Sequence, residues 1–236
     1  MNRIARLVVL PLAAIAWMPS HAEYLADPAA LPPGDAPRTP AAGFYATQLS
    51  LNEYPIFERG AWAHRAVDWT HVRTFRGTAR GTQTGTGGYD DSYALLSGFP
   101  PDQGASAIVR QSPNIDKSCT HEVELLLRVT DNQHSVRGYE VNLSFDGLYI
   151  QIIRWNGPKG DFEVLGDGSY LGFKDGDTFS AQIVGNTITA YVNGALVAQA
   201  TDGEITSGNP GLGFFRRECG TNADMTLTRY MAYAVE

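Results

Sequence analysis

The sequence predicts an all-β protein, an antiparallel β-sandwich of two sheets. Short runs rich in Val, Ile, Thr, Tyr and Phe alternate apolar with polar residues and are separated by glycine turns. Asn193-Gly194 lies between two such runs, and both central positions of the type I′ turn that joins hairpin strands need a positive φ. No stretch has the apolar period of a long amphipathic helix. The stretch from Asp175 to Phe215 therefore predicts an antiparallel meander.

Residues 1–22 predict a signal peptide. Arg3 and Arg6 precede an apolar run from Leu7 to Met18, and Ser20 and Ala22 supply the small residues of a cleavage site. The run is shorter than the roughly 20 residues of a spanning helix, and no later segment is apolar enough to span a bilayer. We expect a secreted or periplasmic protein without a membrane span after processing; an uncleaved anchor is the alternative.

Residues 23–50 predict a Pro/Ala-rich lead-in or tether. Five prolines lie among alanines and glycines, and neither a helical nor a strand period is visible. From residue 51 the composition changes to Tyr, Trp, Val, Ile and Thr, so we expect one β-sandwich domain over 51–236.

The charge argues against nucleic acid and anionic lipid as partners. The chain has 18 Lys and Arg against 25 Asp and Glu, a formal charge of −7. Loss of Arg3 and Arg6 with the signal peptide leaves 16 basic residues and a charge of −9. Such a surface repels both kinds of partner, although it permits a locally positive pocket.

The two cysteines, Cys119 and Cys219, predict one disulfide. Two cysteines in an exported chain most simply pair with each other. Two buried thiols are the alternative, and zinc is disfavoured because neither cysteine belongs to a CxxC pair.

The central region predicts three neighbouring strands with one apolar and one polar face each. Residues two apart lie on the same face of a strand. The apolar sets, expected in the core, are Val123, Leu125, Leu127 and Val129; Tyr139, Val141, Leu143 and Phe145; and Leu148, Ile150 and Ile152. The opposite sets, expected to share a surface, are Glu122, Glu124, Leu126 and Arg128; Glu140, Asn142 and Ser144; and Tyr149, Gln151, Ile153 and Trp155. Asp146-Gly147 predicts the hairpin turn between the second and third strands.

The order of these elements, the WNGPKGDF loop, the GDTFSAQIVGNTITAYVNGALVAQATD stretch and the closing SGNPGLGFF resemble a concanavalin A-like lectin/glucanase domain. The GNTITAYVNGALV hairpin is also similar to laminin-G-like domains and to exported bacterial proteins of this fold without clear assigned activity. The resemblance covers residues 51–236 and implies a jelly roll with one concave sheet. It indicates fold more than function, because relatives include lectins, adhesion modules, glycosidases and polysaccharide lyases.

We expect the polar sets to line the concave face and to bind a polysaccharide noncovalently. Carboxylate, amide and guanidinium groups can bond sugar hydroxyls, and an aromatic ring can stack on a sugar. The candidate ligand-binding residues are Glu124, Arg128, Glu140, Asn142, Tyr149, Gln151, Arg154 and Trp155. Trp155 is the predicted stacking ring at the rim, although a Trp that packs beneath the following loop is an equal alternative.

An enzyme on the same face is the main alternative. A retaining glycosidase needs two carboxyl groups about 5 Å apart, and the E-x-D-x-x-E pattern of concanavalin-like glucanases is incomplete here because Leu127 replaces its last carboxylate. Glu124 and Glu140 could still approach across strands. VELLLR and Gln151-Ile152-Ile153 echo alginate-lyase-like strands, with Arg128, Gln151 and Tyr149 as candidate catalytic groups. However, Ile153 replaces the histidine of that pattern, and no tyrosine-lysine-alanine-glycine segment appears near the end.

The sequence offers one candidate for a metal site. Asp90 and Asp91 follow the glycine-rich loop 81–88 and are candidate calcium ligands, with aspartate-capped turns as the alternative. No other cofactor is predicted, since the sequence lacks HExxH, GxSxG and phosphate-loop patterns. A laminin-G-like adhesion module that binds protein is the third functional class.

Overall fold

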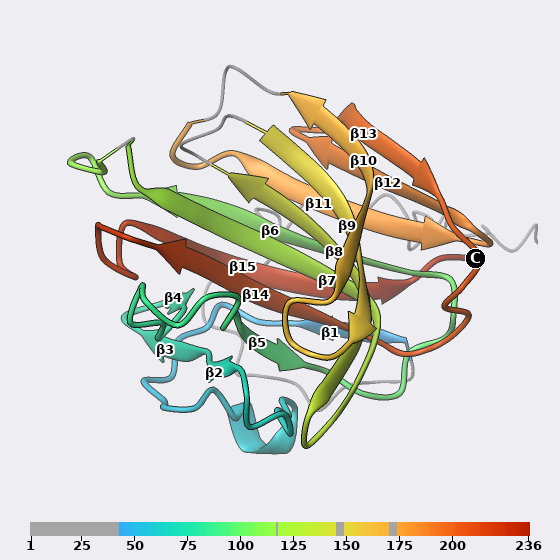
Figure 1. The fold of residues 1–236 in the computed structure, drawn as a ribbon, viewed down its shortest axis with the longest axis horizontal. Helices are drawn as coiled ribbons and strands as arrows, with labels where there is room; N and C mark the ends of the chain where they lie inside the picture. Colours follow the sequence, from blue (N-terminus) through green and yellow to red (C-terminus); the bar gives the residue numbers. More distant parts are fainter. Residues whose placement is uncertain (1–42, 117, 145–148, 170–173) are drawn as a thin grey trace, which may run out of the picture.

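The computed structural model describes residues 43–236 except 117, 145–148 and 170–173, and it contains two β-sheets packed face to face (Figure 1). Sheet A has the order β13-β12-β11-β6-β15-β4-β3, with β1 also paired to β15. Sheet B has the order β10-β9-β8-β7-β14-β5-β2; its β2–β5 pair is parallel and the other described pairs are antiparallel. The predicted two-sheet jelly-roll sandwich is confirmed.

The strands of sheet A are β1 (Phe44–Ala46), β3 (Arg73–Phe75), β4 (Thr78–Arg80), β6 (Gln103–Gln111), β11 (Thr178–Val184), β12 (Thr187–Val192), β13 (Ala195–Thr201) and β15 (Met225–Ala234). Those of sheet B are β2 (Thr70–His71), β5 (Ser92–Leu95), β7 (Thr120–Asn132), β8 (Ser135–Ser144), β9 (Tyr149–Gly157), β10 (Phe162–Ser169) and β14 (Asn209–Arg217). A single 3-10 turn, η2 (Glu58–Gly60), is the one helical element in the described part of the chain, and no helix there has the length and apolar character to cross a membrane.

The predicted meander forms β11, β12 and β13, three consecutive antiparallel neighbours in sheet A. Asn193 and Gly194 join β12 to β13 with φ values of 51° and 79°, the positive values that a type I′ turn needs. The Asp146-Gly147 turn, together with Phe145 and Leu148, lies outside the described residues.

The apolar faces meet between the sheets, as the alternation predicts. Val123, Leu125 and Leu127 of β7 are fully buried there. They pack with Tyr139, Val141 and Leu143 of β8 and with Ile150 and Ile152 of β9. Burial of each large apolar side chain stabilises the fold by about 2 kcal/mol, so this face of sheet B is the side that the core occupies.

The sandwich begins earlier than residue 51. Phe44–Ala46 pairs with β15, and Tyr45 and Leu49 are buried in the core. At least residues 44–49 of the predicted lead-in therefore belong to the domain. A three-residue strand is too short to show a period. The signal peptide and most of the lead-in lie outside the described residues.

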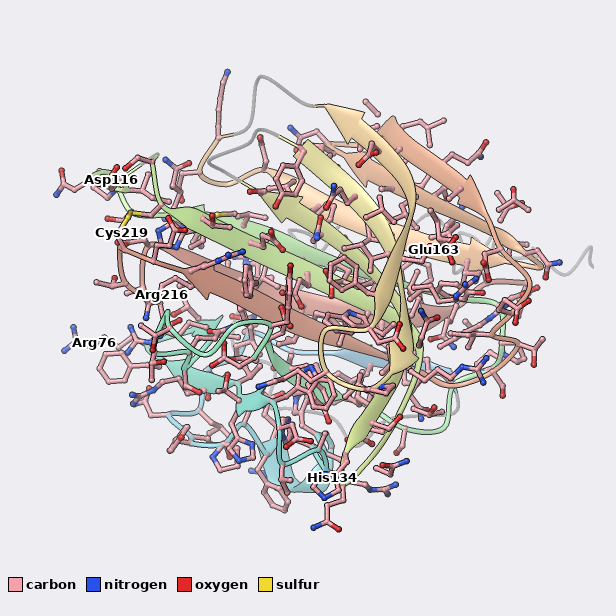
Figure 2. All side chains as sticks on the ribbon, viewed as in Figure 1. Arg76, Asp116, His134, Glu163, Arg216 and Cys219 are labelled. Atoms are coloured by element: carbon pink, nitrogen blue, oxygen red, sulfur yellow. A yellow bond between two sulfur atoms is a disulfide. The ribbon has the colours of Figure 1, made fainter. Side chains whose placement is uncertain are left out.

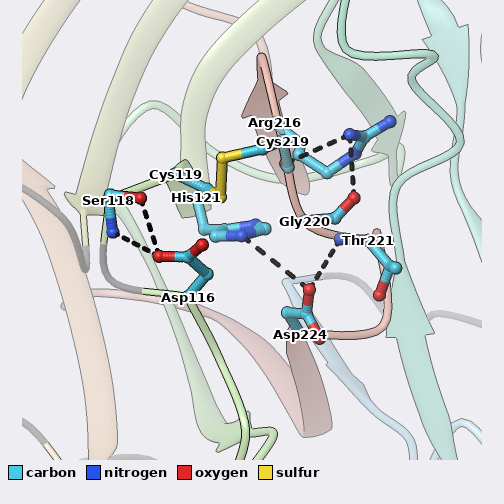
Figure 3. The surroundings of a disulfide bond; sticks show 9 residues. All are labelled: Asp116, Ser118, Cys119, His121, Arg216, Cys219, Gly220, Thr221 and Asp224. Carbon is cyan, nitrogen blue, oxygen red and sulfur yellow. Dashed lines mark hydrogen bonds and ion pairs between the residues drawn. A yellow bond between two sulfur atoms is a disulfide. The ribbon is translucent and has the colours of Figure 1, made fainter.

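The predicted disulfide between Cys119 and Cys219 is present, with their Cα atoms 5.2 Å apart (Figure 3). It joins the residue before β7 to the turn after β14. Arg216 donates to the carbonyl oxygens of Cys219 and Gly220 at 3.3 and 3.2 Å, which holds the same turn. Figure 2 shows this end of the molecule, marked by Cys219, far from the β7–β8 turn marked by His134.

Candidate functional site

The outer face of sheet B, the side away from sheet A, carries the predicted polar residues. Glu124 opposes Asn142 across β7 and β8, Asn142 opposes Gln151 across β8 and β9, and Gln151 opposes Asp167 across β9 and β10. This polar row thus crosses four adjacent strands, and its members become more exposed from Glu124 towards Asp167. Gln151 Nε2 donates to Asp167 Oδ1 at 3.0 Å, and Asn142 Oδ1 accepts from the Gln151 backbone N–H at 3.1 Å.

Three carboxylates meet beside the buried end of the polar row. Asp91 precedes β5, Glu124 lies on β7 and Glu140 on β8, and one carboxylate oxygen of each lies within 4.8 Å of the others. Their exposed fractions are 7 %, 1 % and 2 %. Asp91, Glu124 and Glu140 together form the acidic cluster. Strand β14 runs between β5 and β7, and Gly213 lies there opposite Glu124.

Glu140 is the only member of the acidic cluster with side-chain donors among the described residues. Trp155 Nε1 donates to Glu140 Oε2 at 2.6 Å, and Asn142 Nδ2 donates to Glu140 Oε1 at 3.0 Å. Asn142 Nδ2 also donates to Glu122 Oε2 at 3.2 Å, and the Tyr149 hydroxyl donates to Glu122 Oε1. Glu122 therefore adds a fourth carboxylate next to the cluster, with partners of its own.

Burial and mutual repulsion disfavour the charged forms of these acids. Burial, followed by the proximity of Glu140 and Glu122, raises the pKa of Asp91 well above its usual range. Burial, then Glu140 and Asp91, does the same to the pKa of Glu124. Burial raises the pKa of Glu140 to about 7, although the bonds from Trp155 and Asn142 lower it in part.

A small group of aromatic side chains lies over the same face. Tyr89, in the loop before β5, has its ring centroid 5.2 Å from Phe162 on β10 and 6.3 Å from Phe215 on β14. In Figure 1 the β9–β10 turn folds back in front of β7 and β14, which agrees with these contacts. Tyr89 itself is 42 % exposed.

Arg128 does not join the predicted surface. Its φ is +50°, and the register of β7 with β8 shifts between Leu127 and Thr130. This β-bulge reverses the alternation, so the Arg128 side chain bonds the carbonyl oxygens of Pro101, Ile205 and Gly185 instead. Val129 is displaced by the same bulge into an apolar cluster on the outer face. The lyase interpretation therefore loses Arg128, one of its three candidate catalytic groups.

Arg154 and Trp155 also differ from their predicted roles. Arg154 points away from the outer face, where it forms ion pairs with Asp202 and Glu163. Trp155 is 5 % exposed and packs against Trp69 and Phe162, so its ring is not a platform for a sugar. It supports Glu140 from beneath the aromatic residues, which matches the packing alternative.

The remaining predicted residues come together. Glu124, Glu140, Asn142, Tyr149 and Gln151 share the outer face, and Asp91 joins Glu124 and Glu140. Asp90 is buried beside them, with Oδ1 unpartnered among the described residues. Sequence reasoning placed Glu122 on this surface without naming it as a candidate ligand residue, and it did not assign Asp167, Tyr89 or Phe162 to the surface. Glu122 alternates with Glu124 on β7, and its contacts with Asn142 and Tyr149 show that it takes part in the same surface.

A hydrolase built on Glu124 and Glu140 meets the distance requirement but not the requirement for access. Their oxygens approach within 4.8 Å, but the two carboxylates are 1 % and 2 % exposed. General acid catalysis needs the acid within hydrogen-bonding reach of the substrate atom. In this structure a sugar ring cannot reach either group, whereas a proton or a small cation needs far less space.

Comparison with family models found no match, and comparison with curated proteins found none. Solved structures with a similar fold include the metal-free exoplasmic/lumenal domain of VIP36, with a TM-score of 0.57, 8% identity and coverage of 81% of this chain and 94% of that one. The carbohydrate recognition domain of Emp46p gives 0.54, 10% identity and coverage of 80% and 95%. A glycosidic hydrolase gives 0.53, 16% identity and coverage of 83% and 97%. The chain therefore has a concanavalin A-like jelly-roll fold.

Proposed function

We propose that this protein is an exported carbohydrate-binding protein that holds a polysaccharide on the outer face of sheet B, at the exposed end of the polar row. The observation that carries the proposal is this row of hydrogen-bonding groups across four strands, half-exposed at Gln151 and exposed at Asp167. Amide and carboxylate groups side by side can donate to and accept from neighbouring sugar hydroxyls.

Tyr89 takes the stacking role first assigned to Trp155. It is exposed, and its contacts with Phe162 and Phe215 hold the ring in place, so little conformational freedom is lost on binding. Tyr149 lies two residues before Gln151, on the same face of β9, and is half-exposed. The fold shared with the Emp46p carbohydrate recognition domain is consistent with this role, and export is consistent with the disulfide.

The test is affinity electrophoresis on a panel of neutral and uronate-containing polysaccharides, with release of reducing ends and of ultraviolet-absorbing unsaturated products measured on the same samples. We expect retention by at least one glycan without cleavage. Gln151→Ala and Tyr89→Ala should each weaken retention about tenfold or more, which corresponds to 1.4 kcal/mol.

Tyr54→Ala is the matched control, because Tyr54 is 63 % exposed and lies in a different loop. Equal retention of all three variants would contradict the proposed site. Cleavage that disappears in Glu124→Gln would replace binding with hydrolysis. No retention by any glycan would favour the adhesion class, in which the ligand is a protein.

A further inference from the structure

The acidic cluster contains buried carboxylate oxygens that bond to nothing in the described part of the chain. Glu124 Oε1 and Asp91 Oδ2 are inaccessible to solvent and accept no hydrogen bond. None of the described Lys, Arg or His side chains forms an ion pair with Asp91, Glu124 or Glu140. Burial of a carboxylate without partners costs several kcal/mol, so the folded chain must neutralise the cluster in another way.

The backbone makes room for this convergence. A Cβ atom on Gly213 would lie 2.1 Å from Glu124 Oε2 and 3.2 Å from the Ser92 carbonyl oxygen. Only glycine at this position lets the Glu124 carboxylate extend over β14 towards Asp91. The three carboxylates come from three separate strand regions, so their meeting is not a consequence of local sequence.

The third carboxylate is oriented from outside the cluster. Trp155 Nε1 and Asn142 Nδ2 each bond one oxygen of Glu140. Each carboxylate oxygen has a second lone pair, so Glu140 can still bind a further partner. Bonds of this kind hold ligand carboxylates in place at metal sites.

We propose that Asp91, Glu124 and Glu140 bind one divalent cation and that calcium is the preferred ion. Calcium takes oxygen ligands at about 2.4 Å, so two of its ligands can lie up to about 4.8 Å apart, as the three oxygens do. A cluster made only of carboxylates suits calcium, magnesium or manganese rather than softer metals. Calcium tolerates irregular and bidentate carboxylate geometry, which a site assembled from three strands provides.

This site extends beyond the calcium ligands that the sequence suggested. Asp91 is common to both, but its partners are Glu124 and Glu140 on the sheet rather than Asp90 in the same loop. The inference does not depend on the proposed glycan.

The experiment is isothermal titration calorimetry of the full chain, stripped with EDTA and dialysed, with calcium chloride and in parallel with magnesium and manganese chlorides. We expect one calcium ion per chain, bound more tightly than magnesium or manganese. Glu124→Gln should weaken calcium binding at least 30-fold. Gly213→Ala, which displaces the same carboxylate without removing it, should weaken binding by a smaller factor. Far-ultraviolet circular dichroism establishes that each variant is folded.

Glu204→Gln is the matched control, since Glu204 is exposed and remote from the cluster in sequence. It should bind calcium like the original protein. Absence of calcium binding, or equal affinity in folded Glu124→Gln, Gly213→Ala and Glu204→Gln, would overturn the proposal and indicate that shared protons neutralise the acids. Tighter binding of magnesium or manganese would overturn the choice of calcium. If Glu124→Gln does not fold, Glu140→Gln provides the same comparison.

Discussion

Two charged side chains on strand β7, four residues apart, are both buried but have opposite surroundings. Arg128 has its guanidinium bonded to three carbonyl oxygens and to Asp102 Oδ1, at 2.7 to 3.1 Å. Glu124 has no hydrogen-bond donor within the described chain. The fold itself satisfies Arg128, whereas for Glu124 we propose that a bound cation supplies the missing partner.

Glu58 shows that this protein can satisfy a buried carboxylate when stability requires it. Glu58 is 2 % exposed, as deeply buried as Glu140. It accepts from the Tyr45 hydroxyl at 2.5 Å, the Thr47 hydroxyl at 2.6 Å and Trp62 Nε1 at 2.7 Å. Because Glu58 has three donors, the lack of a donor at Glu124 is a local property of the acidic cluster rather than a general feature of the fold.

The largest effect is expected from removal of the Arg128 guanidinium, which the fold itself satisfies with hydrogen bonds. Arg128→Met keeps the length of the side chain but leaves Asp102 and three carbonyl groups without their donor. We expect the free energy of unfolding to fall by about 3 kcal/mol, equally with calcium and with EDTA. Urea unfolding under both conditions measures it. A loss that vanishes in EDTA would mean that Arg128 acts through the cluster.

The two buried carboxylates should respond differently to the same substitution. Glu58→Gln weakens three bonds to a charged acceptor and should cost about 2 kcal/mol in EDTA. Glu124→Gln removes a charge without partners and should cost nothing in EDTA, while it abolishes stabilisation by added calcium. Thermal unfolding with EDTA and with calcium distinguishes them. Equal losses in EDTA would show that Glu124 is satisfied in the same way as Glu58.

A support of the acidic cluster should have an intermediate effect. Trp155→Phe keeps an aromatic ring against Trp69 and Phe162 but removes the N–H that bonds Glu140. Loss of such an outer hydrogen bond weakens metal binding by about tenfold or more. Calorimetry with calcium should show this change with little change in the unfolding midpoint in EDTA. Unchanged affinity would exclude Glu140 as an oriented ligand.

The smallest effect concerns a satisfied carboxylate near the other face of the sheet. Burial alone would raise the pKa of Asp202, but bonds from the Tyr139 hydroxyl, the Glu204 backbone N–H and Arg154 lower it overall. Its stabilising contribution is therefore present above the unfolded pKa of about 4 and is lost as the pH falls through the lower folded value. Asp202→Asn should cost about 1 kcal/mol at neutral pH, and this cost should shrink as the pH falls through the folded pKa of Asp202. A cost independent of pH, measured by urea unfolding, would show that charge is not involved.

Alternation in the sequence was sufficient to predict which residues share each face of β8 and β9. Asn142, Tyr149 and Gln151 lie where a period of two places them, because no bulge interrupts the pairing of β8 with β9. Arg128 was beyond reach, since a bulge at a residue other than glycine or asparagine leaves no sign in the sequence. Its positive φ is an unfavourable conformation that many long-range contacts maintain.

Long-range packing explains the rest of the acidic cluster. Asp91 joins Glu124 only because β14, which begins more than a hundred residues after Asp91, enters sheet B between β5 and β7. Nothing in the sequence marks Gly213; its role is visible only in the structure, where a Cβ atom at this position would collide with the Glu124 carboxylate. The burial of Trp155 likewise depends on Trp69, which lies in a segment without regular structure and so follows no period that the sequence could show.

A crystal structure of the protein grown with calcium would show whether Asp91, Glu124 and Glu140 are the ligands of a cation. We expect one ion in contact with Asp91, Glu124 and Glu140 at about 2.4 Å, with Gly213 alongside. Carboxylates joined to each other by short oxygen–oxygen contacts, with no ion between them at saturating calcium, would contradict this expectation.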